Sequence, residues 1–309
     1  MKIKKPKFWD YKKPNFFSYL LIPLTLPIII NNFFLYKNKI KKNDKIKNIC
    51  IGNIYVGGTA KTPLTIKINK ILENLNFKSA TIKKFYKNQI DEQKLLNEKT
   101  RLYCFKSRIK ALKEAIKDGF EIAVFDDGLQ DKTIYYDLKF VCFNSLTWIG
   151  NGLLIPAGPL REKIESIKKY DAIFLNGNDE DNSHLINEVK KYNSNIQIFE
   201  TFYNPTNLNE FNKNDDYVIF SGIGNSESFK KTLTKNKLNI IKEFVFPDHY
   251  EYKTKDIDKI KIEAKSLNAK IITTEKDYIK LNDNEIKFLK IETSIKKEEN
   301  LINFLKSKL

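Results

Sequence analysis

Short runs of β-branched and aromatic residues alternate along the chain with longer polar segments that carry an apolar residue every three or four positions. The short runs predict strands and the longer segments predict amphipathic helices, because these two elements repeat every two and about every 3.6 residues. Strands are expected at residues 48–56, 79–83, 121–125, 139–143, 172–175, 195–199, 217–221, 240–246 and 270–273. Helices are expected at residues 62–75, 108–117, 184–192, 226–233 and 257–267. This alternation predicts an α/β fold with a mostly parallel sheet.

One polar stretch interrupts the alternation. Residues 204–216 contain five Asn and one Pro, a composition typical of a linker. We therefore expect an N-terminal segment at 1–47, a first α/β domain at 48–203, a linker at 204–216 and a smaller α/β domain at 217–309.

The N-terminal segment has an uncharged, largely apolar stretch at residues 15–36, between two lysine clusters. As a helix it would be about 33 Å long, which nominally reaches across a bilayer core. Pro23 and Pro27 would interrupt that helix, Asn31 and Asn32 are costly in hydrocarbon, and lysines flank both ends. These features favour a segment that lies in the interface of an anionic membrane. A transmembrane span and a helix of a soluble core are the alternatives.

The charge of the chain is unevenly distributed. Its net charge is +17, and residues 1–47 hold twelve lysines against two acidic residues. Only Arg101, Arg108 and Arg161 are arginines, whereas surfaces that read phosphate backbones favour arginine. We therefore expect no nucleic-acid partner. The three cysteines are odd in number and lie in apolar runs, which predicts buried reduced thiols and excludes a disulfide scaffold.

A glycine turn joins the first expected strand to the first expected helix. Residues 52–63 read GNIYVGGTAKTP. In a phosphate-binding turn of this kind, backbone N–H groups hold the anion, a lysine reaches the terminal phosphates and a hydroxyl binds Mg²⁺. The strict P-loop pattern is not met, because Tyr55 and Ala60 stand where it has glycine. An ordinary strand-to-helix turn is the alternative.

A second candidate is the strand end at Asp126 and Asp127, which Gly128 follows. Carboxylates at the carboxyl edge of a parallel sheet hold Mg²⁺ in P-loop proteins. An Asp-Gly turn without a function is the alternative, and the glycine turn 64 residues upstream favours the metal site.

Further motifs make the pattern specific. They are Asp91-Glu92, Asp126-Asp127-Gly128-Leu129-Gln130, Gly150-Asn151-Gly152, Pro156-Ala157-Gly158-Pro159-Leu160-Arg161-Glu162, Gly222-Ile223-Gly224, Phe246-Pro247-Asp248-His249 and Thr273-Thr274-Glu275-Lys276-Asp277. With the glycine turn, and in this order, they resemble the motifs of the tetraacyldisaccharide 4'-kinase family. The resemblance runs essentially end to end and includes Phe8-Trp9. It implies a P-loop-type three-layer core with a parallel sheet, a second, smaller α/β domain and an N-terminal membrane-associating helix.

The resemblance also implies an activity and a location. The family transfers the γ-phosphate of ATP to the 4'-hydroxyl of a tetraacylated glucosamine disaccharide 1-phosphate, a step in lipid A biosynthesis. We therefore expect ATP and Mg²⁺ as cofactors and no obligate protein partner. The acylated disaccharide stays in the bilayer, which implies an enzyme at the cytoplasmic face of the bacterial inner membrane, peripheral or monotopic.

The family's functional residues map onto this sequence one by one. The resemblance implies a nucleotide cradle of Tyr55, Val56, Gly57, Gly58, Thr59, Ala60, Lys61 and Thr62. It implies Mg²⁺ ligands, direct or through water, at Thr62, Asp126 and Glu162, with Asp127 nearby. It implies four catalytic residues, namely Asp91, His249, Lys61 and Asp127. Asp91 would act as base toward the sugar hydroxyl, and His249 from the second domain would support it. Without the family, Asp91 is explained as a helix cap and His249 as a loop histidine bonded to a carbonyl.

The sequence departs from the family in four places, one of which is Ile90 in place of the glycine before Asp91-Glu92. Ala60 stands for a glycine, Asp131 stands for a histidine, and residues 84–87 read KFYK where the family has Arg-Gly-Tyr-Gly. Alanine at a position with positive φ would cost about 1–2 kcal/mol. Three further hypotheses stay open here: a membrane-bound P-loop ATPase of the partition or positioning type, a non-enzymatic basic binder, and a family member without activity.

Overall fold

The computed structural model describes residues 5–35, 42, 44–131, 133–177, 181–281 and 283–309. Contacts divide the chain into two compact units. The first comprises residues 1–85, 100–202 and 295–309, and the second comprises residues 86–99 and 203–294. Five lysines of the N-terminal clusters lie outside the described residues, namely Lys2, Lys4, Lys37, Lys39 and Lys41.

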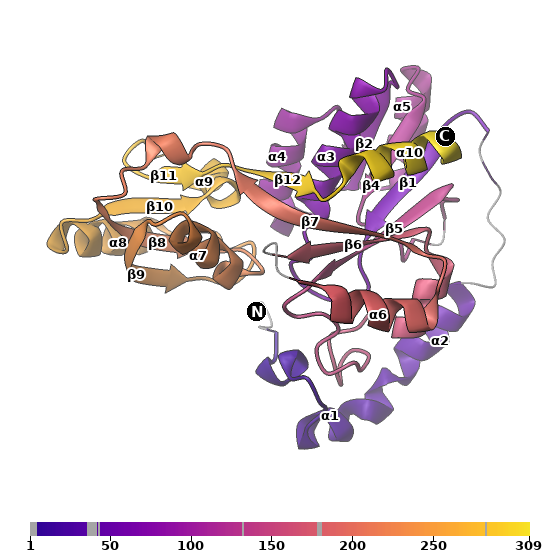
Figure 1. The fold of residues 1–309 in the computed structure, drawn as a ribbon, viewed down its shortest axis with the longest axis horizontal. Helices are drawn as coiled ribbons and strands as arrows, with labels where there is room; N and C mark the ends of the chain where they lie inside the picture. The colour runs from indigo at the N-terminus through magenta and orange to yellow at the C-terminus, as the bar shows by residue number, and fades with distance from the viewer. Residues whose placement is uncertain (1–4, 36–41, 43, 132, 178–180, 282) are drawn as a thin grey trace. The chain divides into compact units, whose positions relative to one another are not determined.

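The first unit contains most of a sheet with the strand order β12-β7-β6-β5-β1-β4-β2-β3 (Figure 1), of which β12 up to residue 294 and the end of β7 are assigned to the second unit. The strands are β1 (Lys47–Gly52), β2 (Ser79–Lys84), β3 (Leu102–Phe105), β4 (Ile122–Asp126), β5 (Leu138–Asn144), β6 (Ala172–Gly177), β7 (Gln197–Pro205) and β12 (Ile291–Ile295). From β3 to β7 every neighbouring pair is parallel. The carboxyl ends of β1 and β4 therefore meet at one edge of the sheet.

Helices cover both faces of this sheet. Along β1, Ile49 and Ile51 pack into a cluster with α3 (Lys61–Asn74) and α10 (Glu298–Lys308), whereas Cys50 packs into a cluster with α5 (Arg108–Lys117). The second face also carries the 3₁₀ turn η4 (Ile164–Lys169) and α6 (Ser183–Tyr192). The alternation follows from the two-residue period of a strand. The predicted three-layer α/β core with a parallel sheet is confirmed.

The second unit has a parallel sheet of its own, in the order β11-β10-β8-β9. Its strands are β8 (Asp216–Ser221), β9 (Asn239–Val245), β10 (Lys270–Thr274) and β11 (Lys287–Leu289). α7 (Ser226–Lys235) packs on one face of this sheet and α8 (Thr254–Ser266) on the other. α4 (Ile90–Lys99) packs against α9 (Glu275–Leu281).

The two units do not follow the linear boundaries expected from the sequence. Leu301 and Leu305 of α10 pack into the core of the first unit, so the end of the chain belongs there rather than with residues 217–294. α4, expected within the first domain, groups with the second unit because it packs on α9. Within the expected linker, β7 continues to Pro205, and Phe211 is buried against the second unit's core.

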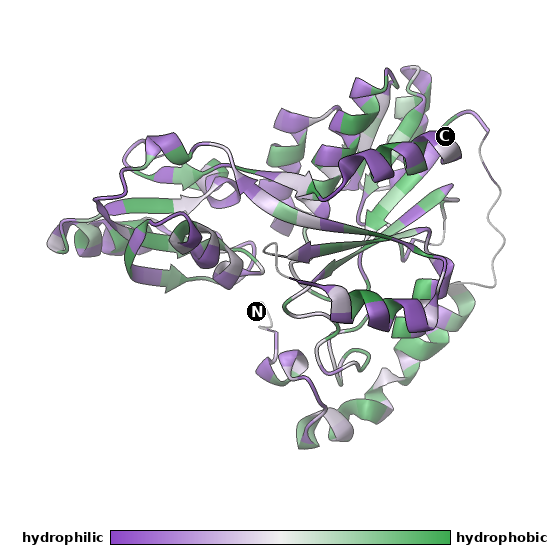
Figure 2. Cartoon of the chain, in the orientation of Figure 1, coloured by the Kyte–Doolittle hydropathy of each residue, from purple (hydrophilic) through white to green (hydrophobic). Residues whose placement is uncertain are grey.

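The N-terminal segment is a broken helix in the first unit. η1 (Lys7–Asp10) precedes α1 (Phe16–Leu21), and the 3₁₀ turn η2 (Ile22–Thr25) separates α1 from α2 (Leu26–Leu35). Pro23 and Pro27 fall at this interruption. The run is strongly hydrophobic (Figure 2), and only 11% of its most apolar window is buried. In the part of the chain that the structure describes, Phe16–Phe34 is the one helix long and apolar enough to cross a membrane, by length and composition.

Candidate functional site

The glycine turn connects β1 to α3 in a left-handed conformation. Gly57 has a φ of +142°, and Ala60, the residue before α3, has φ +64° and ψ 22°. Alanine therefore occupies a positive-φ position, at the place where the family motif has glycine, and it adds strain there. The Asn53 side chain supports the turn, because Nδ2 donates to Thr59 Oγ1 at 2.9 Å.

The first residues of this turn, Tyr55 and Val56, contact the segment at Pro159 and Leu160. The N–H of Val56, which was expected in the phosphate cradle, donates to Pro159 O at 2.9 Å. Tyr55 is buried and bridges to Leu160, and its hydroxyl accepts from Lys5 Nζ at 2.8 Å and donates to Asp10. The backbone that remains for an anion is therefore the part from Gly57 onward.

Asp126 is the last residue of β4, and its side chain contacts the first turn of α3. Thr62 Oγ1 donates to Asp126 Oδ2 at 3.1 Å, and Lys83 Nζ is 2.6 Å from the same oxygen. The side chains of Lys83 and Asp126 are 3% and 0% exposed. Asp126 Oδ1 is buried and has no hydrogen-bond partner among the described residues. The site therefore presents one unused carboxylate oxygen beside a hydroxyl.

Asp127 lies among cations. Arg161 Nη1 is 3.3 Å from Asp127 Oδ1, and Arg108 Nη2 donates to the Asp127 carbonyl. Burial alone would raise the pKa of Asp127, but Lys61, Arg161, Lys83 and Arg108 together hold that pKa below its usual value. The carboxylate is thus ionised and lies among cations that could also attract a phosphate group.

Glu162, the third expected metal ligand, is buried in a hydrogen-bond network. Its Oε1 accepts from Gln130 Nε2 at 2.8 Å and its Oε2 accepts from the Tyr170 hydroxyl at 3.0 Å. Because both oxygens have donors, Glu162 holds Gln130 in place. Gln130 Oε1 in turn accepts from Arg161 Nη1 at 3.3 Å.

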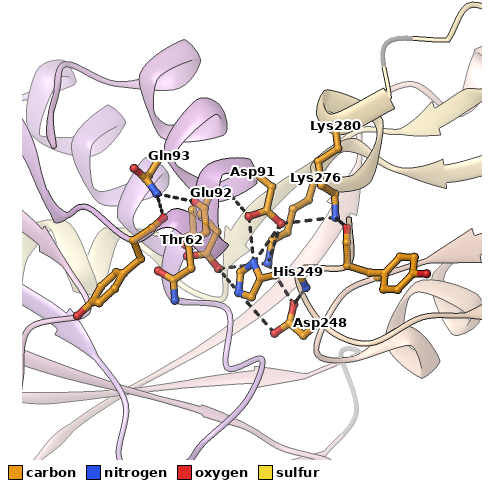
Figure 3. Close-up of polar contacts among 12 residues, drawn as sticks. Thr62, Asp91, Glu92, Gln93, Asp248, His249, Lys276 and Lys280 are labelled. Atoms are coloured by element: carbon orange, nitrogen blue, oxygen red, sulfur yellow. Dashed lines mark hydrogen bonds and ion pairs between the residues drawn. The ribbon is translucent and has the colours of Figure 1, made fainter. Parts of the chain in front are cut away.

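Asp91 and His249 form a pair inside the second unit (Figure 3). Nδ1 of His249 is 2.9 Å from Asp91 Oδ1 and 3.1 Å from Oδ2. Burial would raise the pKa of Asp91, but the hydrogen bond from His249 and the charges of Lys276 and Lys280 hold it below its usual value. His249 has a φ of +56°, and its N–H donates to Gly222 O at 3.0 Å. The two expected residues are therefore in direct contact, as a carboxylate and an imidazole.

The expected site residues fall into two groups. Lys61, Thr62, Asp126, Asp127 and Glu162 belong to the first unit. Asp91 and His249 both belong to the second, although the sequence suggested that they come from different domains.

Two charged residues at these sites, Lys83 and Arg108, were not assigned a role from the sequence, and a third, Lys276, was expected only to stabilise a strand-to-helix turn. Lys83 pairs with Asp126, Arg108 is 3.1 Å from Asp131, and Lys276 contacts the carboxylates beside His249. Lys83 carries a usable signal, because a lysine inside a β-branched run is buried only when it is paired. The other two lie on polar helices, where a charge is ordinary.

Comparisons with known proteins point to one family. A family model described as tetraacyldisaccharide-1-P 4'-kinase matches residues 23–309. The chain is 54% identical to the tetraacyldisaccharide 4'-kinase of Pelagibacter ubique (strain HTCC1062), over 99% of this chain and 98% of that protein. It is 34% identical to the protein of the same name from Rickettsia canadensis (strain McKiel), over 98% and 96%. A crystal structure of LpxK from Aquifex aeolicus in complex with ATP has the same fold, with a TM-score of 0.71 at 22% identity over 94% of this chain and 99% of that one.

Proposed function

Because the chain belongs to the tetraacyldisaccharide-1-phosphate 4'-kinase family, we propose that it transfers the γ-phosphate of ATP to the 4'-hydroxyl of a tetraacyldisaccharide 1-phosphate. The product is the 1,4'-bisphosphate precursor of lipid A. The observation that carries the proposal is the family match over residues 23–309, which contains both the glycine turn and the Asp91–His249 pair.

The glycine turn is the proposed site for the triphosphate. Its backbone from Gly57 to Thr62 would donate N–H groups to phosphate oxygens, and Lys61 and Arg161 would neutralise their charge. The cations around Asp127 support this assignment, because Lys61 and Arg161, which act on this carboxylate, can also neutralise a phosphate group. Phosphoryl transfer needs little from the protein beyond positioning and charge neutralisation.

The residues around Asp126 fit a Mg²⁺ ion. The unused Asp126 Oδ1 and the Thr62 hydroxyl are oxygen donors of the kind Mg²⁺ prefers, and the ion usually keeps waters and takes only one or two carboxylates. A bound Mg²⁺ would neutralise charge that develops on the transferring phosphoryl group. We propose Thr62 and Asp126 as the ligands of the ion. Glu162 and Gln130 form a hydrogen-bonded pair that would support the site without binding the ion directly.

Asp91 is the proposed base. Its ionised carboxylate would take the proton of the 4'-hydroxyl as the oxygen forms its bond to the γ-phosphorus and the bond to the ADP oxygen breaks. His249, at 2.9 Å, would hold the carboxylate in place and share the incoming proton. With Asp91 ionised, Nδ1 is the nitrogen that donates in this pair.

The N-terminal segment is the proposed membrane contact. Exposed apolar side chains on α1, η2 and α2 include Phe16 at 75%, Leu20 at 65% and Leu24 at 60%. A four-chain lipid stays in its bilayer, since each buried CH₂ contributes about 0.8 kcal/mol. An enzyme that binds at the cytoplasmic face of the inner membrane, with this segment in the interface, would meet that lipid without extracting it.

The test is a transfer assay. Purified full-length protein is incubated with [γ-³²P]ATP, Mg²⁺ and the acylated disaccharide 1-phosphate in detergent, and a second phosphate is sought on the sugar. We expect Lys61→Ala and Asp91→Asn to lower kcat at least 100-fold. Lys70→Ala on α3 and Glu98→Gln on α4 are matched controls, since both side chains are exposed on the same helices.

The outcomes separate the hypotheses. Transfer that needs Lys61 and Asp91 but neither control residue supports the kinase. ATP hydrolysis that ignores the lipid would instead favour a membrane-bound P-loop ATPase. Full transfer by Asp91→Asn would remove Asp91 from the base role while leaving the kinase activity itself standing.

A further inference from the structure

The ammonium of Lys276 lies among three carboxylates of the second unit (Figure 3). Its Nζ is 3.2 Å from Glu92 Oε1, 3.3 Å from Asp248 Oδ1 and 3.7 Å from Asp91 Oδ2. The Lys276 side chain is 18% exposed and that of Asp91 only 2%. One partly buried ammonium therefore forms ion pairs with three carboxylates.

The same three carboxylates surround His249. Asp91 contacts its Nδ1, while Nε2 is 3.7 Å from Glu92 Oε1 and 3.8 Å from Asp248 Oδ2. Carboxylates this close disfavour one another's ionised form, and a cation that touches all of them offsets this. Without the ammonium, a proton bound to Asp91 would relieve the repulsion.

The neighbouring Lys280 does not duplicate Lys276. Lys280 Nζ is also 3.7 Å from Asp91 Oδ2, but it lies closer to the buried Asp277, at 2.6 Å from Oδ1, and donates to Tyr250 O at 3.0 Å. Its charge is thus largely matched by that of Asp277. Tyr252 also lies near Asp91, and it is kept protonated because burial and the charge of Asp277 raise its pKa. It therefore adds no charge.

The backbone of Gly222 forms hydrogen bonds both to His249 and to the residue that follows Lys276. The Gly222 N–H donates to Asp277 Oδ2 at 2.8 Å, and Gly222 O accepts from the His249 N–H at 3.0 Å. Thr274 Oγ1 also donates to Asp277 Oδ2, at 2.8 Å. Asp277, which directly follows Lys276, is therefore anchored to the same glycine as His249, and this links the backbone positions of Lys276 and His249.

We propose that Lys276 is a positioning residue for Asp91, whose carboxylate it keeps ionised and aligned with the His249 ring by binding Glu92 and Asp248 at the same time. This inference rests on the proposed function, because only a base that accepts a proton needs to start ionised. Lys276 itself takes no part in the bond changes. Burial alone would lower the pKa of Lys276, but the charges of Glu92, Asp248 and Asp91 raise that pKa above its usual value, so the ammonium is charged at neutral pH.

The test compares the full-length protein with Lys276→Met, Lys276→Arg and Lys99→Met. Lys99 is the matched control, because it joins α4 to α9 through Glu275 at 2.9 Å and is absent from the ion pairs of Asp91. The first readout uses the protein without nucleotide or lipid. The ring resonances of His249, one of only two histidines, are followed in histidine-labelled protein and report the protonation of the carboxylate beside them.

We expect the pH midpoint at which Asp91 is protonated, as reported by these resonances, to move up by about one pH unit or more in Lys276→Met. Lys276→Arg and Lys99→Met should keep the parent transition.

The second readout is the pH profile of phosphate transfer. In Lys276→Met the acid limb of kcat/KM should move up by the same amount, and activity should recover to within about threefold of the parent above the shifted limb. A lysine that only packs α9 would lower activity equally at all pH values. An unshifted transition in folded Lys276→Met overturns the proposal. If Lys276→Met melts early, Lys276→Gln, which keeps a donor without the charge, decides in the same way. Failure of the parent protein to phosphorylate the lipid would overturn the kinase proposal, while the resonance titration would still decide whether Lys276 controls Asp91.

Discussion

The side-chain amide of Asn32, in the apolar helix α2, donates a 2.8 Å hydrogen bond to the backbone carbonyl of Arg161. The Arg161 N–H donates in turn to Ile54 O at 2.6 Å, and its guanidinium lies beside Asp127. The segment proposed to contact the membrane therefore touches the backbone that carries a phosphate-site arginine. Trp9 adds a second contact to the same block, through Nε1 and Pro156 O at 3.0 Å.

This contact predicts that Asn32→Ala lowers phosphate transfer without weakening membrane binding. One lost hydrogen bond costs about 1 kcal/mol, or roughly fivefold in kcat/KM. Transfer is measured on lipid dispersed in detergent, and binding is measured by co-sedimentation with anionic vesicles. Leu24→Ser is the comparison: its exposed leucine would bury apolar surface in lipid, so vesicle binding should fall about tenfold. If Asn32→Ala reduces sedimentation and leaves transfer in detergent intact, α2 serves only as an anchor.

The buried pair of Lys83 and Asp126 predicts a large stability effect. Lys83→Met leaves a carboxylate with 0% exposure uncompensated, which should lower the free energy of unfolding by about 3–5 kcal/mol. The measurement is urea unfolding at pH 7. Lys47→Met is the matched control, since Lys47 lies on β1 of the same sheet at 3.9 Å from Asp137 and is 40% exposed. It should cost no more than about 1 kcal/mol. Equal losses in the two variants would mean that the Lys83 pair is not special.

The left-handed Ala60 predicts a stabilising substitution. Ala60→Gly relieves the strain at φ +64° but makes the unfolded chain more flexible, so the net gain should be about 0.5–1 kcal/mol. Ala115→Gly, inside α5, should instead lose about 1 kcal/mol or more. Both are measured by thermal unfolding of the protein without nucleotide. A loss of stability in Ala60→Gly would show that the turn does not strain this alanine.

Much of the fold could be predicted from the sequence, because the strong hydrophobic periods coincide with buried elements. The run expected at 108–117 is α5 to the residue, and the run at 79–83 is β2 with one residue added. Elements of weak period were missed, including β3 (Leu102–Phe105), whose four residues are all half-buried. α9 was missed too, since its polar sequence is held by contacts of Asp277 with Gly222 and Thr274 rather than by an apolar stripe.

The site was predictable only as far as motifs extend. The approach of Asp91 to His249, 158 positions apart, followed from the family resemblance, and nothing in the local spacing requires it. Lys83 and Lys276 depend on which strand end or helix end meets which carboxylate. That is decided by packing. Lys83 stands out only as a lysine within a β-branched run, and no local mark separates Lys276 from the other lysines.

The cations around Asp127 predict how stability depends on pH. Because Lys61, Arg161 and their neighbours hold the folded-state pKa of Asp127 below the unfolded value of about 3.9, the ionised carboxylate stabilises the fold above that value. This contribution is lost as the pH falls through the folded-state pKa. Urea unfolding between pH 2 and pH 6 should therefore show a smaller loss in Asp127→Asn than in the parent protein. Arg161→Met, which removes one cation, should move the parent's loss to higher pH. Identical pH dependence in all three proteins would mean that Asp127 does not couple to the cations beside it, and the charge balance proposed for the phosphate site would then have to be assigned to other carboxylates.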